Sequence, residues 1–470
     1  MEGFEMGKVK VLTARQAADL IKDGDTVTLS GFVANGIAEA LNAAAEERFL
    51  ETGHPKDLTL FWVAGTGNKD GSHADHYAHE GMVKKVIGGH FNFVPKICEM
   101  LSENKIEGYN VPQGAIAQML RDNAAHKVGT ISHVGIGTFA DPRNGGGRLS
   151  EKTKEDIVKV IELEGQEQLF YPRIPLDVAF IRGTYADELG NITLEKEMAP
   201  LDATSQAMAV HNNGGLVVVQ VERVVKAGHL DPKLVKIPGI YVDAVVECPA
   251  DDPKQSQSIN CTYDPAYAGN TQVPVSSLEP KKLDAKKIIG RRAAMELKKN
   301  VVVNLGVGVP EWVSSVAAEE GVADEMTLTV ECGPVGGVPG GGLRFGGSVN
   351  AQAYMDEGYQ FDFYDGGGLD LCFLGLAEVD NNGYVNVSRL GTRITGSGGF
   401  TNISSNSKKA VFCGTFTNGV KIQTGDGKLT ILEEGKKHKF VKKVTEITFS
   451  GVVAGKAGKD VLYGTERAVF

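Results

Sequence analysis

Two distant segments of the chain carry the same pattern, and this repeat limits the possible folds more than any other feature. DVAFIRGTYADELGNIT begins at Asp177, and DLCFLGLAEVDNNGYVN begins at Asp370. Aligned without gaps, they share residues at Asp177/Asp370, Phe180/Phe373, Asp187/Asp380 and Gly190/Gly383. Each segment predicts a strand, a loop, an Asp-x-x-Gly turn and a second strand.

A second pair of segments matches upstream of the first. DTVTLSGFVANGIAE (25–39) resembles the shorter segment VVVNLGVGVPE (301–311). Each follows an amphipathic helical pattern, ARQAADLIK or RRAAMELKK. Unrelated strand-turn-helix units also look alike by chance, but two matches in the same order favour a duplicated fold.

Short β-branched runs alternate with helical patterns along the chain. DTVTLSGF, DLTLFWVAG and KVGTISHVGIG predict buried strands. ARQAADLIKDG and AEALNAAAEERFLETG predict helices, the second ending at Gly53. This alternation predicts an α/β protein with mainly parallel sheets.

The boundary between the two copies falls in a polar, proline-containing stretch without periodicity. Residues 248–282 are therefore predicted to be a linker. The two related α/β domains are then 1–247 and 283–470, and we expect the active site between them.

Charge and composition exclude several classes of protein. A net charge of −10 disfavours a nucleic-acid surface, which needs a basic face. No secretory signal and no apolar stretch of ~18 residues is present, so no membrane span is expected. The six cysteines are scattered without a CxxC pair, which predicts reduced thiols in a cytoplasmic protein.

Glycine is abundant, at 59 of 470 residues, or about 13% against the usual level of about 7%. The P-loop pattern GxxxxGK[ST] is absent. NLGVGVPEW contains GxG after a predicted strand but lacks the third glycine of a dinucleotide fingerprint, so nicotinamide binding is disfavoured. Its backbone amides are more simply expected to approach another ligand at a helix N-terminus.

Other candidate sites are weaker. HADHYAH places His73, His76 and His79 at spacings that drift around a helix, so surface histidines are favoured over a metal site. No GxSxG elbow is present for a hydrolase serine. Cys332 is a possible nucleophile, but no neighbouring feature marks a base, and a small residue at a strand end is the simpler interpretation.

One carboxylate stands at the end of a predicted strand, in LTVECGPVGGVPGGGLRFGG (328–347). Glu331 either caps a turn or pairs with Arg344, or it is a nucleophile that attacks an activated acyl group. A nucleophile would need light solvation and nearby amide donors for the oxyanion. Four glycine-rich segments offer such donors: GPVGGVPGGG, NLGVGVP, YDGGGLD and GSGGF. The pattern alone leaves the two interpretations open.

Longer runs give the chain a recognisable family likeness. In the first half they are GDTVTLSGF, YNVPQG, EQLFYP, DVAFIRGTYADELGNIT and VKIPGIYVD. In the second they are AKKIIGRRAAMEL, VVNLGVGVPE, LTVECGPVGGVPGGG, QFDFYDGGGLDL and FCGTFT. With these runs the sequence resembles the family I coenzyme A transferases, in particular their single-chain bacterial propionate (acetate/lactate) type. Relatives of this type continue for several dozen residues beyond GTERAVF, a departure that touches no residue named for the chemistry.

The resemblance implies roles for individual residues. Glu331, in Glu-Cys-Gly, corresponds to the nucleophile, and Asn304 and Gln113 to side-chain donors at the oxyanion. Gly367 and Gly368 are expected to supply backbone amides. Further glycines expected to approach coenzyme A are Gly306, Gly308, Gly366, Gly398 and Gly399.

The implied reaction is a ping-pong transfer through an acyl-glutamyl anhydride and a glutamyl-CoA thioester. Its partners are acyl-CoA and short-chain carboxylates, with coenzyme A as a substrate and covalent intermediate and no permanently bound cofactor or metal. A homo-oligomer is expected. The alternatives are an acyl-CoA hydrolase on the same fold, a non-catalytic ligand-binding α/β protein and, least favoured, a nicotinamide oxidoreductase.

Overall fold

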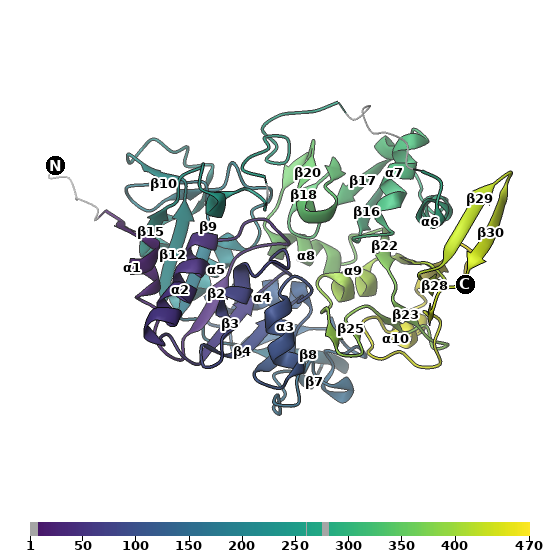
Figure 1. Cartoon of the computed structure of the whole chain (residues 1–470), viewed down its shortest axis with the longest axis horizontal. Coiled ribbons are helices and arrows are strands. Elements are labelled where there is room, and N and C mark those ends of the chain that lie inside the picture. Colours follow the sequence, from purple (N-terminus) through teal and green to yellow (C-terminus); the bar gives the residue numbers. More distant parts are fainter. Residues whose placement is uncertain (1–7, 260, 275–281) are drawn as a thin grey trace.

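Two parallel sheets lie side by side in the computed structural model, which describes residues 8–259, 261–274 and 282–470 (Figure 1). The first sheet has eight strands, and every pairing between neighbours is parallel. In spatial order they are β1 (Lys10–Leu12), β15 (Ala244–Glu247), β12 (Leu216–Val221), β9 (Val178–Arg182), β2 (Thr26–Leu29), β3 (Leu58–Trp62), β4 (Val83–Gly88) and β5 (Glu107–Asn110).

The second sheet has seven strands and a parallel core with an antiparallel edge. Its order is β21 (Ala353–Tyr354), β18 (Pro334–Val335), β17 (Met326–Thr329), β16 (Val301–Leu305), β22 (Leu371–Gly375), β27 (Lys409–Cys413) and β32 (Asp460–Gly464). The predicted α/β fold with mainly parallel sheets is confirmed.

Helices pack against both sheets. The first half contains α1 (Ala14–Ala18), α2 (Glu39–Thr52), α3 (Pro95–Ser102), α4 (Gln113–Ala124) and α5 (Ala203–Asn212). The second contains α6 (Ala285–Ala294), α7 (Glu311–Glu319), α8 (Glu357–Asp365), α9 (Phe400–Asn406) and α10 (Gly451–Lys456). Gly53 ends α2 with a φ of 73°, as its sequence predicts. None of the helices in the described ranges has the length and apolarity that crossing a bilayer requires.

The sequence repeat is also a structural repeat. Asp177, just before β9, accepts the backbone amide of Thr26 at 2.8 Å. Asp370, just before β22, accepts that of Val302 at 2.9 Å. In both halves the aspartate thus fixes the start of the neighbouring parallel strand. The sheet order β3-β2-β9-β12-β15 corresponds to β17-β16-β22-β27-β32.

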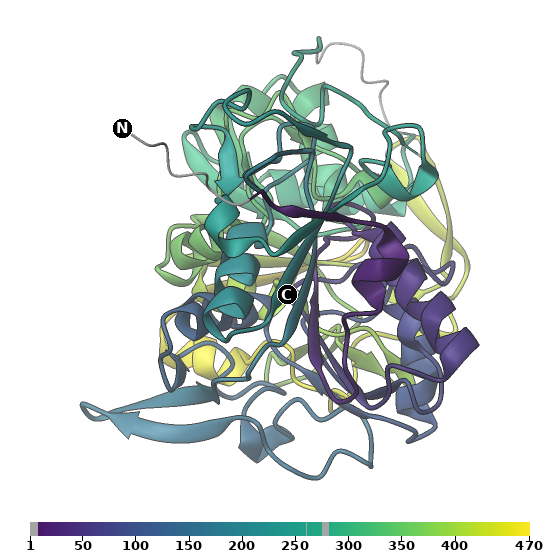
Figure 2. The ribbon, with the colours of Figure 1, turned by 90° about the vertical axis from the view of Figure 1, so that its left-hand side faces the viewer.

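One predicted strand lies elsewhere. KVGTISHVGIG forms β6 (Gly129–Ser132), which joins β8 (Gln166–Pro172) and β7 (Lys159–Leu163) in an antiparallel sheet. Ile131 of β6 is 49% exposed, so the prediction of a buried strand is wrong here. The later hairpin β7–β8, which projects from the body in Figure 2, supplies its partner, and no local pattern reveals that pairing.

The predicted linker is largely part of the packed structure. A 3₁₀ turn at Pro253–Gln255 sits against the first sheet, where Gln220 Nε2 donates to Gln255 Oε1 at 2.6 Å. Arg182 Nη2 donates to the Gln255 carbonyl at 2.8 Å. Ser258 then donates to the Leu343 carbonyl of the second half at 3.1 Å. These glutamine side chains can be buried because backbone groups accept their hydrogen bonds. The polar composition of the segment does not reveal this. Residues 260 and 275–281 of the predicted linker lie outside the described residues.

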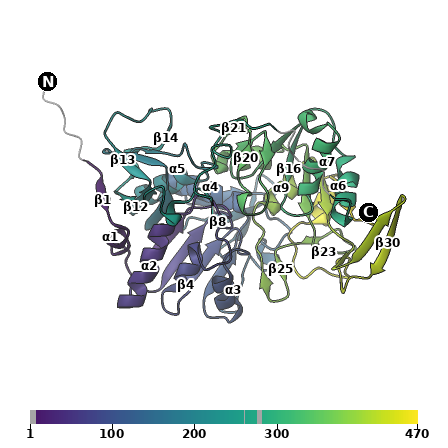
Figure 3. The same ribbon diagram turned by 45° about the horizontal axis from the view of Figure 1, so that its top comes forward.

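The halves meet where α4 packs against α8 and α9, near the middle of the molecule (Figure 3). Gly114 of α4 makes this approach possible. A Cβ there would lie 2.4 Å from Asn402 Nδ2 and 2.5 Å from the Phe361 ring. The Gly114 amide instead donates to Asn402 Oδ1 at 3.2 Å.

We therefore expect Gly114→Ala to destabilise the protein by about 1–3 kcal/mol, because the added methyl overpacks the contact between the halves. Thermal unfolding monitored by circular dichroism would measure this. Gly455→Ala in α10 is the matched control, because a Cβ there meets nothing within 4 Å. An unfolding temperature for Gly114→Ala equal to that of the control would contradict the expectation.

Candidate functional site

The carboxyl ends of strands from both sheets open on one cavity of about 270 Å³. Parallel α/β sheets bind ligands at this edge because loops and helix starts converge there. The first half contributes residues after β2, β3, β4 and β5, namely Phe32, Val33, Gly65, His90, Asn92, Phe93 and Gln113. The second contributes Asn304, Gly306, Val307, Glu331, Phe345, Leu374, Gly375, Val387, Thr395, Gly396, Ser397, Gly398, Gly399, Phe400 and Ile403.

Glu331 lies just beyond β17, half-buried, with its side chain on the cavity. Asn304 Nδ2 is 3.5 Å from Glu331 Oε2, the outer limit of a hydrogen bond. Burial raises the pKa of Glu331 above its ordinary value, and its own amide and Asn304 only partly oppose this. Arg344 instead lies 3.4 Å from Asp264, so the alternative of a Glu331–Arg344 pair is wrong.

Asn304, in β16, is fully buried behind the carboxylate. Its Nδ2 also lies 3.2 Å from the Thr329 carbonyl and 3.4 Å from Tyr364 Oη. Tyr364 in turn donates to Thr329 Oγ1 at 2.8 Å. These contacts fix the amide so that its nitrogen faces Glu331.

Gln113 is the first residue of α4, and its side chain reaches the same cavity from the first half. Its Nε2 donates to Glu357 Oε1 at 2.6 Å. Its backbone amide donates to the Gly398 carbonyl at 3.1 Å. The sequence-predicted trio of Glu331, Asn304 and Gln113 is thus brought together.

The segment GSGGF (396–400) crosses from the second half onto the first. The Gly398 amide donates to the Gly89 carbonyl at 2.7 Å, and the Ser397 amide to Asn110 Oδ1 at 3.0 Å. Gly399 comes next, and a Cβ there would lie 3.5 Å from Glu331 Cγ. Its N–H has no hydrogen-bond partner among the described residues, so it remains available to a ligand beside the carboxylate.

The expectation for Gly366, Gly367 and Gly368 does not hold. They follow α8, and their amides donate to the carbonyls of Asp362, Tyr364 and Phe363 at 3.0, 3.0 and 2.9 Å. They also precede β22, whereas the cavity lies at the opposite end of that strand, at Gly375. Helix termination therefore uses these glycines and their amides.

The expectation that Gly306 and Gly308, in NLGVGVP, approach a ligand through their backbone amides also differs from the structure. The Gly308 amide donates to Glu311 Oε1 at 2.7 Å, and Gly308 does not line the cavity. Gly306 does line it, but its amide donates to the Phe373 carbonyl at 2.8 Å. Gly306 thus provides space, because a Cβ there would come within 3.0 Å of Leu374.

Three polar residues at or behind the cavity were missed by sequence reasoning. His90 follows β4, and burial together with the charges of Lys69 and Arg393 lowers its pKa to about 4, so its imidazole is neutral at physiological pH. Glu357 and Asp202 lie behind Gln113, both buried. Their positions at the first turn of α8 and just before α5 resemble ordinary helix starts, so no sequence signal distinguishes them.

Other candidates have structural roles. Burial raises the pKa of the Cys332 thiol well above its usual range, and its Sγ lies 3.1 Å from the Gly346 carbonyl, as for a small packed residue. His73 is fully buried against Thr66, so the prediction of a surface residue is wrong for it. His76 and His79 each lie 2.7 Å or less from glutamates of α2. The described residues hold no group of three or more His, Cys, Asp or Glu side chains arranged for a metal.

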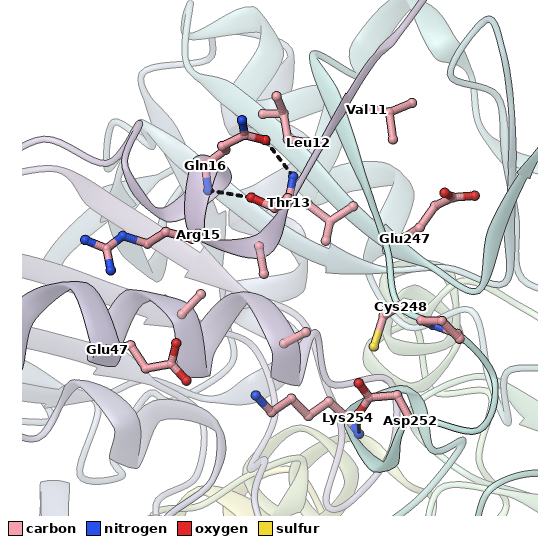
Figure 4. Close-up of a pocket in the computed structure, with 15 residues that line it drawn as sticks. Val11, Leu12, Thr13, Arg15, Gln16, Glu47, Glu247, Cys248, Asp252 and Lys254 are labelled. Atoms are coloured by element: carbon pink, nitrogen blue, oxygen red, sulfur yellow. Dashed lines mark hydrogen bonds between the residues drawn. The ribbon is translucent and has the colours of Figure 1, made fainter.

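A larger cavity of about 520 Å³ lies at the far edge of the first sheet, between α1, α2 and the loop after β15 (Figure 4). Gln16 and Thr13, at its wall, are held in a reciprocal cap of α1. Burial and nearby Asp252 raise the pKa of Cys248 to about 12, so this thiol is protonated at physiological pH. None of the predicted site residues lines this cavity.

Comparison with known proteins identifies related sequences of known activity. The family described as Coenzyme A transferase matches residues 11–248. The chain is 45% identical over 468 residues to the acetate CoA-transferase YdiF of Escherichia coli O157:H7, covering 99% of this chain and 87% of that protein. It is 43% identical over 466 residues to the caffeate CoA-transferase of Acetobacterium woodii, covering 98% and 89%.

Solved structures of a related protein are similar to this chain as well. The crystal structure of the acyl-CoA transferase YdiF apoenzyme from E. coli O157:H7 has a TM-score of 0.93 to this chain at 43% identity, covering 99% of this chain and 88% of that one. A second structure of that protein, with the same scores, is a thioester complex with CoA.

The raised pKa of Glu331 predicts a stability effect with a definite sign. A carboxyl group with a raised pKa in the folded state binds its proton more tightly there, so stability falls as pH rises from the ordinary glutamate pKa to the raised value. Glu331→Gln should therefore unfold at a higher temperature than the unmodified protein near pH ~8, and the difference should shrink near pH ~5. Exposed Glu151→Gln is the control, and a difference independent of pH would contradict the prediction.

Proposed function

The chain belongs to the coenzyme A transferase family, and we propose that it transfers coenzyme A from a short-chain acyl-CoA to a free carboxylate through covalent intermediates on Glu331. The observation that carries this proposal is the position of Glu331. Its half-buried carboxylate lies on the cavity between the halves, 3.5 Å from Asn304 Nδ2 and next to the amide of Gly399, which has no partner among the described residues.

In the first step the Glu331 carboxylate attacks the thioester carbonyl. The new C–O bond forms as the C–S bond breaks, which gives an acyl-glutamyl anhydride and the CoA thiolate. The thiolate then attacks the glutamyl carbonyl of the anhydride, and the first acid leaves as its carboxylate. A second carboxylate reverses both steps, so one thioester is exchanged for another without ATP.

Charge develops on an acyl oxygen in each step. The donors available for it are the Gly399 amide and the side chains of Asn304 and Gln113, two from the second half and one from the first. Such preorganised donors stabilise an oxyanion by about 3–4 kcal/mol each in enzymes where one has been removed. We propose Gly399 as the backbone donor in place of Gly367 and Gly368.

Water has to be kept from both intermediates, because either would hydrolyse. Phe32, Phe93, Phe345, Phe400 and Ile403 provide apolar walls to the cavity. The same apolar surroundings keep the Glu331 carboxylate lightly hydrated and therefore more nucleophilic. Backbone amides of glycine can approach the reacting carbonyl group closely, because glycine has no side chain to hold them away from it.

Short acids are the proposed substrates. A volume of about 270 Å³ lies below the usual range for drug-sized ligands of about 300–1,000 Å³. Acetate is the acid named for one relative, and caffeate, which is larger, for the other. A panel of acids from acetate to caffeate, assayed with one acyl-CoA donor, would rank them, and we expect the short aliphatic acids to give the highest kcat/KM.

We also propose that the chain forms a homo-oligomer. In support, Val128, just before β6, is 82% exposed, Ile131 of β6 is 49% exposed, and Leu163 of β7 in the same antiparallel sheet is 45% exposed. Light scattering after size exclusion would test this. A cytoplasmic location also remains a proposal, supported by six cysteines that are all free thiols.

Substitution of Glu331 tests the mechanism. Glu331→Ala should abolish CoA transfer, and Glu331→Asp should lose about 100-fold because the carboxylate is displaced by one methylene. Mass spectrometry of the unmodified protein incubated with acyl-CoA alone should show an adduct of CoA minus one water, absent from Glu331→Ala. Glu151→Ala, at an exposed position of the first half, should retain both properties.

Two outcomes would contradict the proposal. A Glu331→Ala protein that still moves CoA between acids would exclude this nucleophile. Release of free CoA at the same rate with and without an acceptor acid would indicate an acyl-CoA hydrolase instead.

A further inference from the structure

Two carboxyl groups lie together behind Gln113, outside the machinery described so far. Glu357 begins α8 and Asp202 precedes α5, and they are 1% and 4% exposed. The carboxyl groups are within hydrogen-bonding reach of each other. Glu357 Oε1 also accepts Gln113 Nε2 at 2.6 Å. The side chains of Asp202, Glu357 and Gln113 thus form a contact series from the interior to the wall of the cavity.

No cation within the described residues forms an ion pair with either carboxyl group. Arg121 of α4 is paired with Asp362, and Lys236 lies 3.4 Å from Asp356. Asp202 Oδ1 is buried without a hydrogen-bond partner among the described groups. Two carboxylates in contact repel each other, so their close approach requires a proton between them.

The surroundings favour that shared proton. Burial, with the charge of Asp356, raises the pKa of Asp202 to about 7, although the Glu357 hydrogen bond and Arg121 oppose the shift. Burial and the charges of Asp202 and Glu331 raise the pKa of Glu357 well above its ordinary value.

Two other titratable groups near α8, Cys332 and Asp365, do not share the environment of the Asp202–Glu357 pair. Cys332, close to Glu357, is a buried thiol that stays protonated. Asp365, at the far end of α8, is held by Asn402 and Asn406, and burial raises its pKa to about 6.

We propose that Asp202 and Glu357 share one proton and act as positioning residues for Gln113, so that one N–H of its side-chain amide is fixed on Glu357 and the other is left to donate to the acyl oxygen. A glutamine side chain presents oxygen or nitrogen equally well unless a partner decides between them. Glu357 Oε1 accepts from Nε2, which holds the nitrogen at Glu357 and puts the amide oxygen beside Gly398, where a Cβ would lie 3.4 Å from it. This inference rests on the proposed function, because it assigns an orientation to one of its oxyanion donors.

Loss of the shared proton has a directional effect. As pH rises through the raised pKa of the pair, a second negative charge appears next to the first, and repulsion drives Glu357 away from Asp202. Gln113 then loses its fixed partner. The transfer rate should therefore fall on the alkaline side, separately from any acid limb caused by protonation of Glu331.

Three variants test the proposal by kcat, KM and thermal unfolding between about pH 5 and about pH 9. Glu357→Gln retains an oxygen that accepts from Gln113, and Asp202→Asn supplies a permanent donor to Glu357. Both should keep most of the kcat and lose the alkaline limb. Glu357→Ala should lower kcat about 10- to 100-fold with KM changed less than about threefold, because a transition-state donor is released.

Asp365→Asn is the matched control: it removes a buried carboxyl with a raised pKa from the same helix, and Asp365 makes no direct hydrogen bond to the Gln113 side chain within the described part of the chain. Its pH profile should equal that of the unmodified enzyme. The inference is overturned if Glu357→Gln and Asp202→Asn keep the original alkaline limb, or if Glu357→Ala folds and keeps the original kcat. If Glu357→Ala fails to fold, the profiles of the two isosteric variants decide. Failure of the proposed function would appear separately, as transfer activity in Glu331→Ala.

Discussion

The energetic cost of holding the Glu331 carboxylate away from water shapes the rest of the site. A guanidinium or ammonium partner would offset that cost but would also make the carboxylate a poor nucleophile. The structure instead gives Glu331 a long contact with Asn304 Nδ2, at 3.5 Å, and the bare backbone of Gly399. The nearest arginine in sequence, Arg344, lies beside Asp264. Under the proposed mechanism this arrangement would keep the carboxylate reactive, at some expense in stability.

The duplicated fold explains why such a site forms between two halves. Each copy has a parallel sheet whose carboxyl ends collect loops, and the two edges face one cavity. Glu331 and Asn304 come from adjacent strands of one sheet, so their separation is set by strand spacing. Gln113 comes from a helix start in the other copy. The glycine of that helix start, Gly114, allows the close packing that brings Gln113 within reach.

Sequence reasoning predicted the parallel sheets, the duplication and the residues with distinctive neighbours, because periodicity and long motifs encode them. It erred where tertiary partners decide. YDGGGLD and GSGGF look equally suited to donate amides, but the first ends α8 and uses its N–H groups on helix carbonyls. The exposed β6 and the buried glutamines of the predicted linker depend on distant segments for their environment. Glu357 and Asp202 look like helix starts until the fold places them in contact.

The peptide groups of Ser397 and Gly398 join the second half to Asn110 and Gly89 of the first. The Gln113 amide adds a third hydrogen bond across the same contact, to the Gly398 carbonyl, and separating the halves would break all three and expose their polar groups to solvent. Entry of acids through the cavity opening would leave these hydrogen bonds intact, whereas a hinge motion between the halves would break them. In the proposed mechanism, coenzyme A stays covalently bound to Glu331 while the small acids exchange.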